Sequence, residues 1–487
     1  MKNSTSNTVI PFTKTKFFCQ SSLAQKLWNV FQNLNENSIK YCHWKSNEHL
    51  SESFCGRTDF DLLISDEDKS AFHFLAVELG LKIRYSTLNK VYPGMEDYIG
   101  LDENSGKLFH LHVHYKLILG KKNQKNYHLP FENLILSTSQ THEFFPIKII
   151  SPEFELLLLS IRSVLKIETG KKLLKNLFRK KNIIPGNTVR EFKYLQQRIN
   201  LALYAKLCNE LFPQMATELI KFSRETPDNF SFFTILKLRR NFFRGLKSYK
   251  IFSGSEEEIE LNRRKLASKK SGSWLRTGGR TIAFVGADGS GKSTTVAEIQ
   301  KWLSWKLSVE TFYMGLPKKK PFFRLLSIFS AVLNKLKLIK IKLYIDNERW
   351  LYAARFRFLN YKAGSKLSKN NKIILFDRFP LKEFWTMNEP MDGPRILAKT
   401  PQAEKERNYY HRIGKPDYLI ILDVSPEESI RRKKTQQIFQ PEKSVNEKIR
   451  AVNKLISSNR SNVILINTEI GREQSLLLIK NKIWEIL

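Results

Sequence analysis

The stretch at residues 281–303 constrains the fold of this chain more than any other part of the sequence. It reads TIAFVGADGSGKSTTVAEIQKWL, which is a short apolar run, then the pattern G-x-x-x-x-G-K-S, then apolar residues at helical spacing. The apolar run is typical of a buried parallel strand, and the glycines allow the loop to curl with its backbone N–H groups pointing inward. This order of strand, loop and helix is the context in which the pattern binds phosphate groups. We therefore expect ATP to bind here.

The loop contains the side chains that phosphoryl transfer requires. Lys292 would neutralise the transferred phosphoryl group, and the hydroxyl of Ser293 would bind Mg²⁺. The N-terminus of the following helix adds a dipole that favours an anion. ATP and Mg²⁺ are thus the expected cofactors, and the expected ATP-binding residues are Gly286, Asp288, Gly289, Ser290, Gly291, Lys292, Ser293 and Thr294.

Parallel strands are predicted throughout the rest of this half of the chain. Apolar runs recur at KIILF (372–376), DYLIILDV (417–424) and NVILIN (462–467), and segments of helical periodicity separate them. Strands that alternate with helices predict a doubly wound parallel sheet. We therefore expect residues 281–487 to form an α/β domain with the fold of P-loop NTPases.

Four stretches of this half resemble the thymidylate kinase family of nucleoside monophosphate kinases. They are GADGSGKST from residue 286, YAAR (352–355) followed by LFDRF (375–379), PDYLIILDVSPEESIRRK (416–433), and NVILINTE from residue 462. The resemblance covers residues 281–487. It implies a kinase that transfers the γ-phosphoryl group of ATP to a phosphorylated acceptor, and the family's usual reaction converts dTMP to dTDP.

The resemblance also implies roles for individual charged residues. Asp377, at the end of a strand, would hold the hydrated Mg²⁺ or orient the acceptor phosphate, and Arg378 would clamp that phosphate. The arginines at the start of the lid would reach the transition-state charge when the lid closes. The expected catalytic residues are Lys292, Asp377, Arg378, Arg431 and Arg432; the expected acceptor contacts are Asp288, Arg355 and Arg378; and the expected Mg²⁺ ligands are Ser293 and Asp377.

Each of these charged groups also has a purely structural interpretation. Asp377 and Arg378 could form a buried ion pair, and Arg355 could belong to a solvated basic face of a helix. The run RRKK from residue 431 could be a charged helix end. The sequence leaves both interpretations open.

The acceptor side departs from the family pattern. Thymidylate kinases carry an Arg-Glu-Pro stretch and a Ser/Ala-Tyr-Gln stretch that touch the nucleotide acceptor, whereas this chain reads MGLPKKKP (314–321) and FPLKEFWTMNEPMDGPR (379–395) there. We therefore expect intact donor chemistry with a rewritten acceptor pocket. The acceptor would be a nucleoside monophosphate, a related phosphorylated small molecule or a glycan.

A basic segment at residues 317–343 points to a second kind of partner. It holds Lys and Arg but no acidic residue, and Leu325, Phe329, Val332 and Leu336 form a helical stripe. Such a segment either contacts an anionic membrane surface or packs on the core with its basic face in water. The net charge of +35 favours polyanionic partners in general, but no motif predicts specific binding of nucleic acid. We expect a cytoplasmic protein that is either free or peripheral to the inner face of a membrane.

The first 280 residues are expected to form other parts. Residues 1–20 predict a flexible lead-in, and residues 253–280 a polar linker. Between them we expect an α+β domain at 21–150 and a helical extension at 151–252 that begins with Ser151 as N-cap. The α+β domain should contain a helix at 23–34 and strands at 60–64 and 108–119.

The stretch CHWKSNEHLSESFCGRTDFDLLI (42–64) resembles the nucleotidyltransferase superfamily through its G-x-T-D-x-D pattern. Asp59 and Asp61 would point to the same side of a strand, and the resemblance implies that they hold divalent metals beside a triphosphate. The strand expected to carry a third carboxylate reads FHLHVHY instead. Its histidines could bind a softer metal or a phosphate, or could be the polar face of a half-buried strand; they are His110, His112 and His114.

Three functions remain open at this point. The leading one is an ATP- and Mg²⁺-dependent phosphotransferase of thymidylate kinase type. The others are a bifunctional kinase and nucleotidyltransferase that processes sugars or glycans near a membrane, and a nucleotide-binding sensor without catalysis. The sequence does not predict the oligomeric state.

Overall fold

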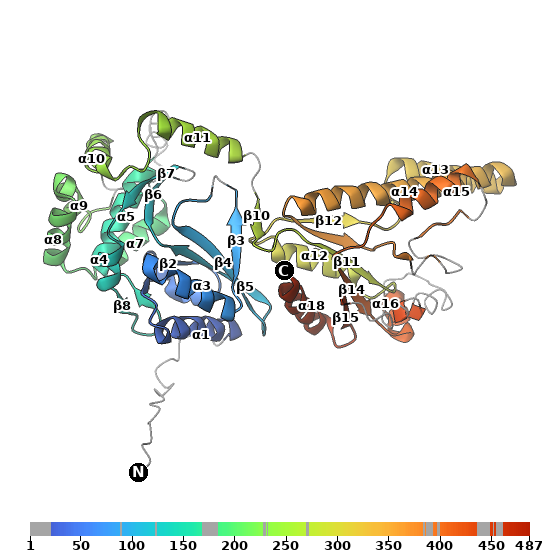
Figure 1. The fold of residues 1–487 in the computed structure, drawn as a ribbon, viewed down its shortest axis with the longest axis horizontal. Helices are drawn as coiled ribbons and strands as arrows, with labels where there is room; N and C mark the ends of the chain where they lie inside the picture. The colour runs from blue at the N-terminus through green and yellow to red at the C-terminus, as the bar shows by residue number, and fades with distance from the viewer. Residues whose placement is uncertain are drawn as a thin grey trace, which may run out of the picture. The chain divides into compact units, whose positions relative to one another are not determined.

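A computed structural model of the chain divides into two compact units, Met1–Ser271 and Gly272–Leu487 (Figure 1). The structure describes residues 21–87, 90–121, 124–167, 184–226, 230, 232–268, 272–382, 385, 393–396, 400–435, 449–450, 452–453 and 461–487. The expected lead-in at 1–20 lies outside these ranges.

The first unit is built on a mixed sheet with strands in the order β3-β4-β5-β2-β1-β9-β8. On β2 and β5, alternate residues such as Leu62 and Leu111 join the core formed with helix α1, and the residues between them lie on the opposite face. The predicted helix and first strand are confirmed: Ser21 caps α1, and β2 occupies residues 60–64. The elements are α1 (Ser22–Glu36), β1 (Tyr41–His43), α2 (Leu50–Phe54), β2 (Phe60–Ile64), α3 (Lys69–Glu78), β3 (Lys82–Ser86), β4 (Met95–Asp102), β5 (Lys107–His114), β8 (Gln140–Thr141) and β9 (Lys148–Ile149).

The prediction of one strand at 108–119 is wrong, because two strands of different sheets share this range. β5 ends at His114, and the backbone N–H groups of Tyr115 and Lys116 both donate to the carbonyl of Gly94. This turn takes the chain out of the first ladder. β6 (Leu117–Lys121) then pairs with β7 (Gln124–Leu129) in a separate antiparallel pair.

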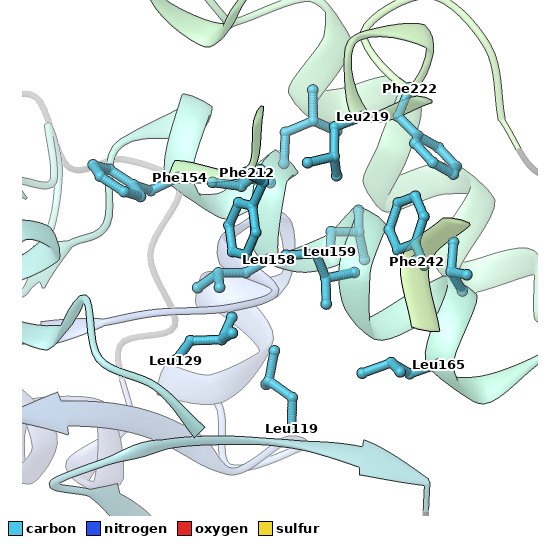
Figure 2. Packing of buried hydrophobic residues seen from close by; sticks show 14 of the residues in the cluster. Leu119, Leu129, Phe154, Leu158, Leu159, Leu165, Phe212, Leu219, Phe222 and Phe242 are labelled. Atoms are coloured by element: carbon cyan, nitrogen blue, oxygen red, sulfur yellow. The ribbon is translucent and has the colours of Figure 1, made fainter. Parts of the chain in front are cut away.

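A helical layer follows, as predicted, from Ser151. Its hydroxyl accepts a hydrogen bond from the backbone N–H of Phe154, and Pro152 opens a helix that is buried along almost its whole length. Figure 2 shows Leu158 and Leu159 of this helix among aromatic and leucine side chains of the layer. The helices from Ser151 onward are α5 (Pro152–Lys166), α7 (Gly186–Gln196), α8 (Leu201–Leu211), α9 (Ala216–Lys221) and α10 (Phe232–Gly245), and the short helix α4 (Glu132–Ser137) precedes them.

The range expected as a linker contains regular structure. Helix α11 (Gly254–Ser268) belongs to the first unit, and strand β10 (Ser273–Leu275) to the second. Buried Arg264 of α11 stacks over the ring of Tyr92 at 4.2 Å and donates to the carbonyl of Val91 at 2.9 Å. These contacts hold α11 against the first unit, although its charged sequence is typical of a solvent-exposed linker.

The second unit contains a parallel sheet in the order β12-β13-β11-β14-β15, and it has the α/β P-loop-type fold that was predicted. Ile374 and Phe376 of β13 pack with Ala354 of α14 on one face of the sheet. The elements are β11 (Thr281–Gly286), α12 (Lys292–Leu303), β12 (Val309–Tyr313), α13 (Pro321–Lys335), α14 (Ile339–Lys369), β13 (Ile373–Asp377), α15 (Pro401–His411), β14 (Tyr418–Asp423), α16 (Pro426–Thr435), β15 (Val463–Asn467) and α18 (Arg472–Ile486). Across the described ranges, no helix combines the length and hydrophobicity that crossing a bilayer requires.

Candidate functional site

The glycine loop lies where three parallel strands end at the same edge of the sheet. β11 runs into the loop at Gly286, with β13 on one side and β14 on the other. The register pairs Phe284 with Asp377 and Gly286 with Leu422. Since the strands are parallel, residues that are about a hundred positions apart in sequence reach the loop together.

The backbone of the loop requires glycine at its turns. Gly289 and Gly291 have φ angles of +87° and +88°, and Gly286 has +151°. A Cβ atom at Gly286 would collide with the carbonyl oxygen of Leu422, and one at Gly289 would lie 3.0 Å from the carbonyl oxygen of Ser429. The loop is therefore held tightly against β14 and α16. This geometry fits a cradle for phosphate groups.

Lys292 is folded back into the loop. Its side chain is only 6% exposed, and Nζ donates to the carbonyls of Gly286 at 2.9 Å and Ala287 at 2.6 Å. Ser290 is buried beside it, whereas Thr294 on the first turn of α12 is exposed. A buried ammonium group among backbone carbonyls is placed to meet an anion in the loop.

Ser293 and Asp377 form the direct link between the loop and β13. The Ser293 hydroxyl donates to Asp377 Oδ2 at 2.7 Å. Asp377 is 8% exposed, and its other oxygen, Oδ1, is buried without a hydrogen-bond partner in the part of the chain that the structure describes. A hydroxyl and a carboxylate are oxygen ligands of the kind that Mg²⁺ prefers. The unsatisfied oxygen therefore fits a cation held at this position.

Arg378 and Asp288 form an ion pair beside the loop, with Nη1 and Oδ1 3.3 Å apart. Arg378 has a φ of +65°, which is uncommon for a residue with a side chain and is often found at functional sites. A Cβ atom on Gly315 would lie 2.8 Å from the Cδ atom of Arg378. The segment at 314–321 thus reaches this arginine.

Two arginines of α14, two residues apart, have different environments. Arg355, expected to contact the acceptor, is exposed. Arg357 is 2% exposed and donates to the carbonyl of Met314 at 2.6 Å and to the hydroxyl of Tyr410. The sequence left open a solvated basic helix face that would include Arg355 and the neighbouring Arg357, and the structure excludes Arg357 from it. Ala354, three residues before Arg357, and Phe358, directly after it, are both buried. These apolar neighbours are the signal in the sequence that would have placed Arg357 in the interior.

The two arginines of α16 also have different surroundings. Arg432 donates to the carbonyl of Gly289 at 3.4 Å and to the carbonyl of Thr468 at 2.8 Å, so it contacts the loop directly. Arg431 is 72% exposed and pairs with Glu428 at 2.6 Å. Hydrogen bonds from Arg431 and Arg432 lower the pKa of Glu428 to about 2. Residues 436–448, which follow the arginines at the start of the expected lid, lie outside the described residues.

The first unit holds a second cluster of charged side chains, on the sheet face opposite α1. The register pairs Asp61 with His112, and the strand alternation places His110 and His114 on the same side as His112. Asp59 Oδ2 lies 3.0 Å from Nδ1 of His110, and Asp61 Oδ1 lies 3.8 Å from Nε2 of His114. The structure thus gathers all five residues predicted for this site.

Asp97 on β4 supplies the carboxylate that the sequence analysis missed. Its Oδ1 lies 2.8 Å from His110 Nε2 and 2.7 Å from His112 Nδ1, and its Oδ2 lies 2.6 Å from Arg84 Nη2. Burial raises the pKa of Asp97, but hydrogen bonds from His110 and His112 outweigh burial and hold the pKa well below its usual value. The signal in the sequence was MEDYIGLD, an acidic strand start just before the histidine strand.

Two groups of ligand atoms in this cluster have the spacing of a metal site. In each group the atoms lie within 4.8 Å of one another; one group is Asp61, His112 and His114, and the other is Asp97, His110 and His112. His114 is 1% exposed, and neither ring nitrogen has a hydrogen-bond partner within the described ranges. Lys45 Nζ lies 2.7 Å from Asp61 Oδ1. Burial, and after it the charge of Lys45, lowers the pKa of Lys125 to about 8, which places a second lysine nearby.

Comparisons with known proteins bear on the kinase-like part of the chain. No family model matches the sequence. A thymidylate kinase of Blochmanniella pennsylvanica is 29% identical over 216 residues, which cover 43% of this chain and 97% of that protein. The uncharacterized ATP-binding protein YghR of Escherichia coli K12 is 27% identical over 174 residues, 31% of this chain and 68% of that protein.

Solved structures were compared as well. Deoxyadenosine kinase from M. mycoides with bound dATP aligns at 20% identity with a TM-score of 0.28, covering 42% of this chain and 98% of that chain. The same enzyme with dCMP and dCDP aligns with a TM-score of 0.30. The sequence relatives, together with the glycine loop, support a P-loop kinase-like region in this chain.

Proposed function

We propose that the second unit is an ATP- and Mg²⁺-dependent kinase of thymidylate kinase type. The observation that carries the proposal is the pairing of Ser293 with Asp377, whose second oxygen is buried and unsatisfied, beside Lys292 inside the glycine loop. The sequence relative named thymidylate kinase supports the same class of reaction.

The chain's own groups divide the task of phosphoryl transfer. The loop N–H groups and Lys292 would bind the β- and γ-phosphates, with Nζ exchanging the carbonyls of Gly286 and Ala287 for phosphate oxygens. Ser293 and Asp377 would hold Mg²⁺, which when bound neutralises charge that develops on the phosphate oxygens. Such fixed charges lower the barrier because they need no rearrangement during the reaction.

The acceptor phosphate would bind on the side of Asp288 and Arg378. Arg378 presents a planar donor fork suited to a phosphate, and the ion pair with Asp288 holds that fork beside the loop. Exposed Arg355 would add a second contact, and Arg431 would approach when the lid closes. We propose a nucleoside monophosphate such as dTMP, or a related phosphorylated sugar or glycan, as the acceptor.

An acceptor screen tests this proposal. Purified full-length protein would be incubated with γ-labelled ATP and Mg²⁺ and with nucleoside monophosphates, sugar phosphates and lipid-linked sugars. We expect label on one acceptor class, and loss of that label in Lys292→Ala. If ATP binds but no acceptor is labelled and ATP turnover is the same in Lys292→Ala, the unit is a nucleotide sensor and the kinase proposal is wrong.

We also propose that the first unit is a nucleotidyltransferase-like module that holds a divalent metal. The specific observation is the close grouping of Asp61, His112 and His114, in which the buried imidazole of His114 has both nitrogens unsatisfied. Asp59, predicted as a ligand, instead contacts His110. Lys45 and Lys125 would bind a phosphate of the nucleotide beside the metal.

Metal titration distinguishes a divalent-metal site from histidines that only form the polar face of a strand. Full-length protein would be titrated with Zn²⁺ and with Mn²⁺ in a calorimeter, and with Co²⁺ while its visible absorption is recorded. We expect one site that His114→Asn abolishes and that His142→Asn, outside the cluster, leaves intact. Equal metal binding by wild type and His114→Asn would show that these residues do not form the site.

A further inference from the structure

The α13–α14 hairpin exposes an apolar surface that the proposed kinase reaction does not use. Phe322, Leu325, Phe329, Val332 and Leu336 are each between 47% and 60% exposed. Their spacing of three and four residues places them on one side of α13. Sequence analysis left open whether this stripe packs on the core, and the structure shows that it does not.

The buried contact with α14 is made mainly by a different stripe of α13, although Phe322 at the start of the exposed stripe also lies 5.1 Å from the ring of Tyr352. Phe323, Leu326 and Ser330 are buried, and the Ser330 hydroxyl donates to Asp346 of α14 at 2.7 Å. Within α14 itself, the buried residues all lie at or after Ala353, the part that packs on the sheet. The hairpin therefore has its own internal contact and still leaves the outer stripe in water.

Apolar side chains continue past the turn and surround the start of α14. Ile339, Ile341 and Leu343 are all more than half exposed. Residues two apart on a helix point about 200° from each other and residues four apart only about 40°, so Ile339 and Leu343 share one face and Ile341 lies on the opposite one. A flat protein partner would cover one side only, whereas a layer of lipid headgroups and acyl chains can enclose the tip on all sides.

The charge around this surface selects the kind of lipid. The segment 317–343 contains eight lysines and arginines and no acidic residue. Lys318, Lys319 and Lys320 precede α13, and Lys335, Lys337 and Lys340 flank the turn, so basic groups lie at both ends of the apolar stripe. Pairing of two copies through this face would bring like charges together, whereas an anionic surface would neutralise them.

We propose that the α13–α14 hairpin binds the surface of an anionic lipid bilayer, with the apolar stripe and the tip entering the headgroup region. The basic residues would remain at the level of the lipid phosphates. This placement would bring the sheet edge that carries the glycine loop to a membrane-bound acceptor or product without any membrane-spanning segment. The membrane contact itself does not rest on the kinase proposal, because the apolar stripe of α13 and the lysines at the turn are not among the groups proposed to bind ATP and Mg²⁺.

Vesicle sedimentation tests the proposal. Full-length protein would be mixed with vesicles of phosphatidylcholine alone or with added phosphatidylglycerol. We expect binding to the anionic vesicles, weakened by salt. The variant Leu325→Ser/Phe329→Ser/Val332→Ser should lose it. Lys337→Glu/Lys340→Glu should bind at least about tenfold more weakly, because each basic residue near an anionic surface contributes about fivefold in affinity.

Matched controls separate the surface from general effects. Lys362→Glu/Lys366→Glu makes the same charge change farther along α14, and Leu478→Ser removes an equally exposed leucine from α18. Both should bind vesicles as wild type does, and thermal unfolding should show that all variants are folded. Two outcomes would overturn the proposal: equal binding by the hairpin variants and their controls, or a vesicle-free dimer that the apolar variant dissociates and that does not bind anionic vesicles.

Discussion

Replacing Asp377 by Asn removes one negative charge from the ATP site and nearly preserves the shape of the side chain. The amide oxygen can still accept the hydrogen bond from Ser293, which is 2.7 Å long in the structure. It cannot neutralise a cation, and the position of the present Oδ1, buried without a partner among the described residues, would carry an uncharged group. We therefore expect a folded protein that binds ATP without productive Mg²⁺.

The substitution should lower kcat but should not lower the free energy of unfolding. Loss of one fixed contact to the reacting charges costs about 100-fold to 1,000-fold in kcat, or about 3–4 kcal/mol of transition-state stabilisation. A buried oxygen without a partner costs the folded protein about 1–3 kcal/mol. Asp377→Asn exchanges an unsatisfied buried carboxylate for an unsatisfied buried amide, which costs less to desolvate, so the free energy of unfolding without ligand should equal or exceed that of wild type.

Catalytic rate and stability would both be measured on the same purified variant. Kinase rates would be recorded over a Mg²⁺ titration, and urea unfolding with and without MgATP. Asp423→Asn is the matched control, because Asp423 ends the neighbouring strand β14 at the same sheet edge and its carboxylate accepts from Val424 N at 3.1 Å. If Asp377→Asn keeps the wild-type response to Mg²⁺, or is destabilised without ligand and still fully stabilised by MgATP, the reasoning about this carboxylate is refuted.

Three further predictions concern the backbone of the loop, the arginines of α16 and a buried carboxyl group. Gly286→Ala should lower the free energy of unfolding by about 3 kcal/mol, because its Cβ would collide with β14. Gly291→Ala, whose Cβ would meet only Thr295 Oγ1 at an ordinary contact distance of 3.9 Å, should cost about 1–2 kcal/mol for its φ angle; thermal and urea unfolding would show the order. Arg432→Ala should raise KM for ATP, because Arg432 contacts the loop. Arg431→Ala, at an exposed position, should lower kcat with KM unchanged. Steady-state kinetics measures both constants, and a change of kcat alone in Arg432→Ala together with a change of KM alone in Arg431→Ala would contradict these roles. Burial raises the pKa of Glu155 from 4.5 to about 7, so its contribution to stability is present below pH 4.5 and is lost as pH rises through about 7. Across this pH window the free energy of unfolding should fall by up to about 3 kcal/mol in wild type, and it should change less with pH in Glu155→Gln.

Local sequence determined the elements that carry the ATP site. A continuous apolar run, glycines at the turns and a helix start specify β11, the loop and α12 without help from the rest of the chain. The same holds for α5, whose cap residue Ser151 binds its own helix. These features are readable because backbone conformation and period depend on residues close in sequence.

Sequence reasoning failed where a contact joins distant segments. Asp97 enters the histidine cluster only because the register of β4 against β5 places it opposite His112. Arg357 and Arg355 are two residues apart, yet only the packing of α14 on the sheet buries one of them. The charged helix α11 looked like a linker, because its contact with Tyr92 spans more than 170 positions in sequence.

The sequence by itself determined that this chain contains a loop for phosphate groups, a parallel sheet behind it and a basic apolar segment between two strands. The tertiary structure decided which oxygen of Asp377 lacks a partner, which arginine contacts the loop, and which stripe of α13 remains in water. The physical reason is that period and glycine placement report local conformation, whereas the satisfaction of a buried atom depends on every segment packed around it.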